Sequence, residues 1–359
     1  MIKRKEMTTI LINLILAKMV LMFPKMLTGN SANAAYLQAL FNTACAFLLF
    51  FLVSFIYRGQ KNVIELAYMS GGKALRIFVG LLVFVSLMMN YASVIRIFPE
   101  TIKIVLLQDI RVDVITLVFE IAIGIGAYIG LRAIARINYM LMPIMGGVLV
   151  MFLVLLIPHY NYLNLMPVFG NGADKIFING FNTLSMYSDL LLLNIFLPFY
   201  ENMGEAKKSG RRAIMISAVF VIIIMLAVCL VFPYPTSDEF MIPLYQLTRM
   251  IHLSSFFSRF EAFFEFAWSL MLLTYSAVYI YALSFVWKET FGLKYSRPLI
   301  FPIVILSEVI ALLPDSLPEL IRNEKWENII VYPVVFLLPF IFGFVSRKYF
   351  GKNRKDGKR

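Results

Sequence analysis

Charged residues are scarce in this chain, and so are cysteine and histidine. Asp, Glu, Lys and Arg together make up 15% of the 359 residues, against about 25% in a typical soluble domain. This scarcity excludes an ordinary soluble globule. Cys45 and Cys229 are the only cysteines, and His159 and His252 are isolated from each other. A disulfide framework or a zinc cluster needs grouped ligands, so both are excluded.

The sequence also lacks the common signatures of catalytic and nucleotide sites. It contains no phosphate loop, no dinucleotide fingerprint and no nucleophile elbow, whose glycines and nucleophile each serve a defined mechanism. Glu261 and Glu265 are one helical turn apart, but no nucleophile or metal ligand accompanies them. We interpret these two as charges that anchor a helix end. We therefore expect that the protein is not an enzyme and that it has no catalytic residue, no metal and no cofactor.

Long apolar segments are abundant. Hydrophobic residues make up 60% of the chain and the mean hydropathy is +0.80. Segments of about 20 apolar residues are typical of membrane helices, where every backbone group pairs within its own segment. The sequence predicts an all-α integral membrane protein with about ten transmembrane helices: 8–23, 35–57, 74–95, 112–131, 138–158, 181–199, 212–234, 262–287, 298–313 and 329–346.

Lys and Arg are distributed unequally between the connections on the two sides of the membrane. With the first residues on the inside, 23 of the 33 Lys and Arg lie on that side, 9 lie on the other and Lys18 remains within the membrane. This positive-inside bias predicts that both termini are cytoplasmic. It also explains the net charge of +12 without a nucleic-acid partner. The basic tail 347–359 is interpreted as an anchor near anionic lipid.

The chain is expected to be a single membrane domain, 1–359, built from two repeats. Repeat one covers about 8–158 and repeat two about 181–346, with five helices in each, so the second repeat enters from the opposite side. Inverted repeats of this kind place a ligand site at the midplane, between discontinuous helices. Pro24 and Pro198 are the predicted helix breaks. The first helix of each repeat also carries a charge, Lys18 or Asp189.

The first helix permits a second interpretation. A basic start, an apolar run and the small residues "SANAA" are also parts of a secretory signal. Lys18 interrupts the apolar run, and Ala34 is distant for a cleavage site. We expect the segment to be retained as a membrane helix.

Six short motifs, in order, resemble those of a known family. They are "LMFPKML", "RIFPETIKIVLL", "GLRAIARINYMLMP", "NLMPVFGNG", "RFEAFFEFAW" and "LLPD". The chain resembles the spore germination permeases, the B subunit of GerA-type germinant receptors, over about residues 8–346. These belong to the amino acid–polyamine–organocation transporter superfamily.

The resemblance implies ten helices in two inverted repeats of five, with helices 1 and 6 discontinuous. It implies a sensor of small nutrients, commonly amino acids, that works with an A subunit and a lipoprotein C subunit in the spore inner membrane. It also implies a site where the first helix unwinds. Small residues are usual there, whereas this chain has Ala17, Lys18 and Met19. Before Pro198, Leu190 and Leu192 replace the usual glycine and acid, with Asp189 just beyond.

A lysine in the middle of a membrane helix costs roughly 2.5 to 3.5 kcal/mol on insertion scales. Our hypothesis is that Lys18 and Asp189 form a buried ion pair, or receive the carboxylate and amine of a ligand. The alternative is that Lys18 extends along its stem to an interface. Ala17, Met19, Asn90, Tyr91 and Ser185 are the other candidate ligand residues. Glu120 is a candidate proton carrier, or else a lightly paired residue near the end of its helix.

Two functions follow from these observations. The first is a membrane sensor, the permease-like subunit of a germinant receptor that signals through partner subunits. The second is a proton-coupled transporter of amino acids or related solutes. A weaker third alternative is a subunit in which the Lys18–Asp189 pair has replaced the ligand.

Overall fold

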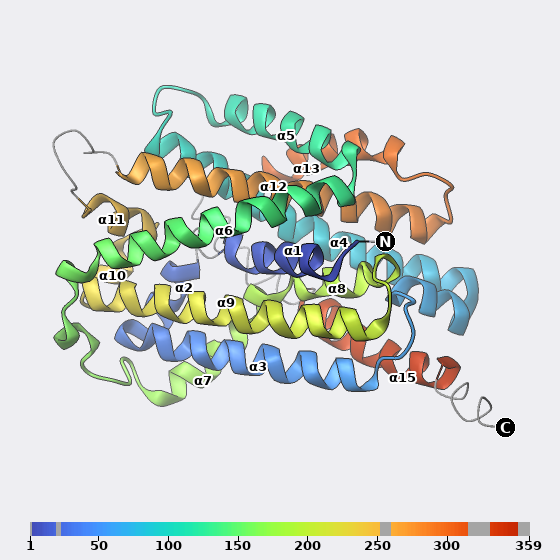
Figure 1. The fold of residues 1–359 in the computed structure, drawn as a ribbon, viewed down its shortest axis with the longest axis horizontal. Helices are drawn as coiled ribbons and strands as arrows, with labels where there is room; N and C mark the ends of the chain where they lie inside the picture. The colour runs from blue at the N-terminus through green and yellow to red at the C-terminus, as the bar shows by residue number, and fades with distance from the viewer. Residues whose placement is uncertain (1, 19–22, 252–259, 315–330, 351–359) are drawn as a thin grey trace.

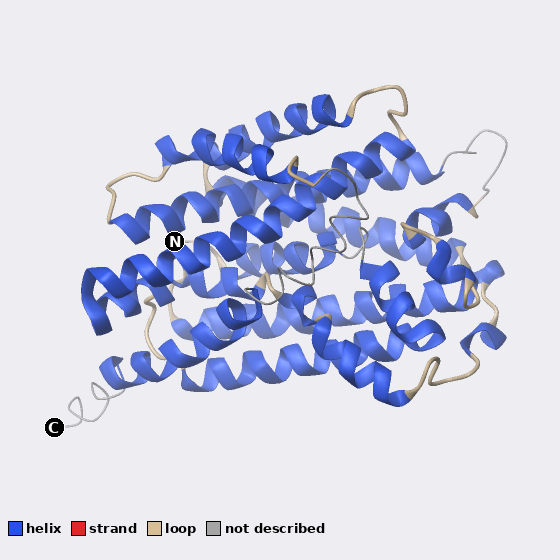
Figure 2. Cartoon of the chain, turned by 180° about the vertical axis from the view of Figure 1, so that it is seen from behind, coloured by secondary structure: helices blue, strands red, loops and turns tan. Residues whose placement is uncertain are grey.

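The computed structural model describes residues 2–18, 23–251, 260–314 and 331–350. Regular structure in these ranges is helical throughout and includes no β-strand, as Figure 2 shows. The all-α prediction is therefore confirmed. In a chain this apolar the helix satisfies each backbone polar group internally, which lipid requires.

The helices differ widely in length. In chain order they are α1 Arg4–Ala17, α2 Phe23–Ser31, α3 Ala35–Ile56, α4 Val63–Val105, α5 Val112–Ile129, α6 Leu131–Leu155, α7 Ala173–Asn182, α8 Leu190–Ile195, α9 Met203–Val231, α10 Thr236–Glu239, α11 Pro243–Arg249, α12 Phe260–Phe291, α13 Ile300–Ala311 and α15 Leu338–Phe350. Short 3₁₀ turns flank α8, η5 at Leu184–Tyr187 and η6 at Leu197–Phe199. A π-helical turn, η8 at Pro333–Leu337, leads into α15.

Seven helical stretches within the described ranges are long and apolar enough to cross a membrane. They are Phe23–Ile56, Val63–Val105, Val112–Ile129, Leu131–His159, Met203–Val231, Phe260–Phe291 and Pro333–Phe350. The other three predicted spans correspond to α1, to the short helices around α8 and to α13. Interruption explains the shortness of the first two, because each is one part of a discontinuous helix.

The helices lie side by side along the long axis of the molecule, with α1 near the centre (Figure 1). α1 packs against α6, α9 and α12, and α12 also packs against α4 and α5. As a result, 10 of the 14 residues of α1 are buried. A helix that is enclosed this way carries apolar residues on all sides.

Both predicted helix interruptions are present, and each lies before the proline rather than at it. α1 ends at Ala17 and Lys18 caps it, while Pro24 is the second residue of α2; residues 19–22 lie outside the described part. In the second repeat α7 ends at Asn182, and Asp189 directly precedes α8. Pro198 lies beyond α8, in η6, so the interruption at Asp189 precedes it. The repeat boundaries stay a prediction.

Polar contacts fix α1 against its neighbours. Near its start, Arg4 Nη1 lies 2.9 Å from Glu205 Oε2 of α9, and the Thr8 hydroxyl donates to Ser209 Oγ at 3.1 Å. Farther along, Asn13 Nδ2 donates to Thr274 Oγ1 of α12 at 3.0 Å. These contacts set the rotation of α1, and with it the direction in which Lys18 leaves the helix.

Candidate ligand site at the two helix breaks

Lys18 and Asp189 form an ion pair between the two interrupted helices. Lys18 Nζ lies 2.8 Å from Asp189 Oδ2, and the side chains are 7% and 1% exposed. Lys18 leaves the C-terminal end of α1 and Asp189 stands at the N-terminal end of α8. At this depth a lone charge is strongly unfavourable, and an opposite charge within about 4 to 6 Å offsets the cost. The site therefore contains one positive and one negative side chain, and its net charge is zero.

Ser188 and Asn90 complete the surroundings of the ammonium. Lys18 Nζ donates to Ser188 Oγ at 3.0 Å and to Asn90 Oδ1 at 3.4 Å. Asn90 Nδ2 in turn donates to Ser188 Oγ at 2.5 Å. Asn90 lies on α4, so these hydrogen bonds connect both helix breaks to a third helix.

Tyrosines of α12 cover the carboxylate. The Tyr279 hydroxyl donates to Asp189 Oδ1, and the Tyr275 ring lies 4.8 Å from that of Tyr279, centroid to centroid. Both side chains are fully buried. The carboxylate is thus held by a cation on one oxygen and a phenol on the other, from two different helices.

A second buried carboxylate, Glu120 of α5, lies behind this site. Ser307 Oγ of α13 donates to Glu120 Oε1 at 3.0 Å, and the Tyr91 hydroxyl of α4 donates to Oε2 at 3.3 Å. The Tyr91 ring stacks on that of Tyr279 at 5.9 Å between centroids. Glu120 has its hydrogen bonds satisfied by neighbouring helices, and it is separated from Asp189 by this stacked pair.

The remaining candidates take varied positions. Ala17 is the last residue of α1, and its carbonyl oxygen accepts from Trp268 Nε1 of α12 at 3.2 Å. Tyr91 belongs to the Glu120 cluster, while Ser185 lies in η5, where its backbone N–H donates to the Tyr332 hydroxyl at 3.3 Å. Ser185 Oγ is buried with no hydrogen-bond partner in the described part of the chain. Met19 lies outside the described residues.

Sequence reasoning did not identify Ser188, Tyr279, Tyr275 or Trp268. The signal available for Ser188 was its place beside Asp189 in "YSDL". For the tyrosines it was their spacing of four residues in "TYSAVYIY", which puts both on one face of a helix. Aromatic residues are common in this chain, so spacing alone did not distinguish these two.

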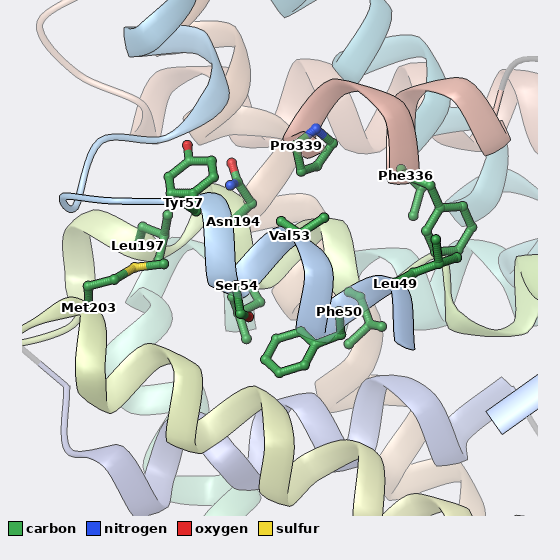
Figure 3. A pocket seen from close by; sticks show the side chains of 13 residues that line it. Leu49, Phe50, Val53, Ser54, Tyr57, Asn194, Leu197, Met203, Phe336 and Pro339 are labelled. Carbon is green, nitrogen blue, oxygen red and sulfur yellow. The ribbon is translucent and has the colours of Figure 1, made fainter. Parts of the chain in front are cut away.

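A separate small cavity lies between α3, α8 and α15 (Figure 3). Its volume is about 50 Å³, and its walls are mostly apolar, with Tyr57 and Asn194 among them. Ligand pockets have volumes of roughly 300 to 1,000 Å³. Asn194 Oδ1 is already used there by the Val63 N–H at 3.0 Å. This cavity is a packing gap rather than a nutrient site.

Within the described residues no group of three or more His, Cys, Asp or Glu could hold a metal ion. The site can instead bind a ligand that carries both a negative and a positive group. Its ammonium suits a carboxylate and its carboxylate suits an amine, and both lie where two helices are interrupted. Such half-helix ends are where transporters of this architecture bind substrates and ions.

The fold and the family are shown by comparison with known proteins. Mhp1, a nucleobase-cation-symport-1 family transporter solved in a closed conformation with bromovinylhydantoin bound, matches with a TM-score of 0.65. The match has 11% sequence identity and covers 100% of this chain and 93% of that one. At this identity the likeness shows the transporter fold alone. No curated protein sequence matches the chain.

The family is shown by a sequence model. The model of the spore germination proteins, the permease-type family to which the six motifs pointed, matches residues 1–319. That match spans both helix breaks and most of the helices described above. The chain therefore belongs to the spore germination protein family.

Proposed function

We propose that this protein is the permease-like subunit of a spore germinant receptor, a sensor rather than an enzyme. It binds a small nutrient between α1, α4, α8 and α12 and transmits a conformational change to partner subunits. The observation that carries this proposal is the ion pair of Lys18 and Asp189, which lies at both helix breaks. Membership of the spore germination family supports the biological setting.

The chemistry of the pair favours an amino acid as the nutrient. A zwitterion presents a carboxylate to Lys18 and an ammonium to Asp189, so it replaces each partner without leaving a buried charge unpaired. A ligand with one charge would strand the other group, at a cost of several kcal/mol. Ser188 and Asn90 supply hydrogen bonds next to Lys18, which suits recognition of a carboxylate.

Signalling would use the contacts that the two interrupted helices make with α4 and α12. The Tyr279–Asp189 and Lys18–Asn90 hydrogen bonds join α8 and α1 to α12 and α4. A ligand that separates Lys18 from Asp189 changes all of these contacts. It shifts the equilibrium between two arrangements only by the difference in its affinity for them. The A and C subunits implied by the family would read that shift.

We also propose the location. The basic connections share one end of the bundle, and α1 begins and α15 ends toward that side (Figure 1); by the positive-inside rule that end would be cytoplasmic. The membrane would be the spore inner membrane, as in the family, or the cell membrane.

A proton-coupled transporter of amino acids is the second candidate. The observation in its favour is Glu120, a carboxylate only 1% exposed, bonded to two hydroxyl groups and lying beyond the stacked tyrosines. Intramembrane carboxylates often carry protons in transporters. Uptake by proteoliposomes under an imposed pH gradient separates the two functions, since a sensor accumulates no solute.

The test of the binding site is a thermal-shift screen of the full-length chain in detergent against amino acids, nucleosides and simple sugars. A true ligand stabilises the folded state by about 2.7 kcal/mol at a hundredfold excess over its Kd. We expect an amino acid to raise the Tm of the wild type and of Lys25→Met, but not of Lys18→Met. Lys25 of α2 is the matched control because its Nζ lies 2.9 Å from Asp238 Oδ1 of α10, in an ion pair separate from that of Lys18. A shift that survives in Lys18→Met, or no shift with any compound, would contradict a nutrient site at this pair.

A further inference from the structure

A second cavity lies beside the connection between α12 and α13, which Figure 1 shows at the right of the molecule. Its volume is about 470 Å³, which is within the range of ligand pockets. Phe199, Tyr281 and Phe285 form one wall, and Lys288, Lys294 and Arg297 are the cations that line it. We call this the basic cavity.

Positive charge in the basic cavity is only partly balanced. Lys288 Nζ lies 2.9 Å from Glu289 Oε1. Neither Lys294 nor Arg297 forms an ion pair with a carboxylate of the described residues. These two cations rest on aromatic rings instead: Lys294 Nζ is 5.2 Å from the Tyr295 centroid, and Arg297 Cζ is 5.6 Å from that of Tyr128. None of the cavity's lining residues is acidic. Among the residues that the structure describes, the cavity therefore offers an anion two cations that have no carboxylate partner.

The surroundings place these cations at the edge of the lipid-facing surface. Tyr128 and Phe301 pack at 6.2 Å between ring centroids, and about half of each side chain is exposed on the outside of the bundle. Leu293 and Tyr295, in the connection itself, are exposed as well. Aromatic side chains with cations directly beyond them are typical of the depth at which lipid headgroups lie.

We propose that the basic cavity binds the phosphate of an anionic phospholipid headgroup. Lys294 and Arg297 would hold the phosphate, and the ring wall of Phe199, Tyr281 and Phe285 would cover the glycerol and the first acyl carbons. Basic pockets between membrane helices bind acidic lipid headgroups for these reasons. Phe199 belongs to η6, directly after the helix that Asp189 begins, so the lipid would contact the segment that carries one half of the candidate ligand site.

The test measures lipid binding by the purified full-length chain in mixed micelles. Native mass spectrometry detects the bound lipid. Phosphatidylglycerol is titrated against phosphatidylcholine, which has the same phosphate but no net charge. The double variant Lys294→Gln/Arg297→Gln removes the positive charge of both residues. The matched control, Lys73→Gln/Arg211→Gln, removes one exposed lysine and one exposed arginine outside the cavity. Arg297→Lys, which keeps the charge, serves if the double variant does not fold.

We expect phosphatidylglycerol to be preferred by the wild type and by the control. The double variant should bind it about thirtyfold more weakly, which corresponds to about 1 kcal/mol for each cation; Arg297→Lys should lose only a small part. Equal binding by the double variant and the control would overturn the assignment. The assignment would also be overturned if inorganic phosphate or glycerol 3-phosphate displaced phosphatidylglycerol at the same concentration as the lipid. The site would then bind a soluble phosphate. Displacement of the lipid by a polyglutamate peptide at equal affinity would instead assign it to an acidic protein segment.

Discussion

Tyr91 of α4 and Tyr279 of α12 stack with ring centroids 5.9 Å apart, and their hydroxyls serve different carboxylates. Tyr91 donates to Glu120 and Tyr279 donates to Asp189. Glu120 and Asp189 are thereby placed on opposite sides of one aromatic pair. Movement of α8 relative to α12 must change the Tyr279 bond, whereas the Glu120 cluster joins α4, α5 and α13 and can stay intact.

Removing either member of the central ion pair should destabilise the protein strongly. We expect Lys18→Met and Asp189→Leu each to cost about 3 to 5 kcal/mol, because each leaves a buried charge alone. The double variant should cost clearly less than the sum, since no charge then remains. Thermal unfolding in detergent measures this cycle. Costs that simply add would mean that the two residues do not interact.

The exposed pair Lys25–Asp238 is the control for that cycle. Its N–O distance is 2.9 Å, close to that of the central pair, but its side chains are 30% and 38% exposed. We expect Lys25→Met to cost no more than about 1 kcal/mol, because water solvates the charge left behind. A large loss there would show that burial does not explain the central pair.

Tyr279→Phe should separate the hydrogen bond from the ring packing. The variant keeps the ring stacked on Tyr91 and removes the donor to Asp189, at an expected cost of about 1 to 3 kcal/mol. Tyr128→Phe, at a half-exposed tyrosine, should change stability by less than about 0.5 kcal/mol. Equal Tm values for the two variants would mean that the hydrogen bond of the Tyr279 hydroxyl does not stabilise the site.

Glu120→Gln should preserve the fold and remove the capacity to carry a proton. The amide still accepts a hydrogen bond, so we expect a loss below about 1.5 kcal/mol, while Glu120→Leu leaves the Tyr91 and Ser307 hydroxyls without this acceptor and costs more. If the protein is a sensor, ligand-induced thermal shifts persist in Glu120→Gln. Proton-driven uptake that is present in the wild type and lost in this variant would favour the transporter.

Two glycines offer a matched test of helix packing. A Cβ built on Gly80 of α4 would lie 2.0 Å from Thr290 Oγ1 of α12, whereas one on Gly146 of α6 would meet nothing within 4 Å. We expect Gly80→Ala to cost about 1 to 3 kcal/mol through overpacking. Gly146→Ala should be neutral or stabilising, because alanine favours the helix. A Gly80→Ala protein as stable as wild type would mean that α4 and α12 can separate at little cost.

Much of the architecture could be predicted from sequence. Apolar content and segment length dictate helices, and the charged residues Lys18 and Asp189 mark the two segments that the structure interrupts. The resemblance of six motifs indicated the family that the sequence model shows. The proline positions were less informative: Pro24 lies in the first turn of α2 and Pro198 follows α8, because proline fits a helix start or end as readily as a break.

The details of the site depended on tertiary structure. In α12, 20 of 32 residues are buried, so polarity alone did not mark the face that carries Tyr275 and Tyr279. Ser188 meets Lys18 and Asn90 only because α1, α4 and α8 are packed in one particular rotation and register. Hydrophobic composition determined that these segments are membrane helices, because lipid selects for it. Hydrogen bonds of about 3 Å between distant segments depend on how the helices pack, and only the folded chain decides that.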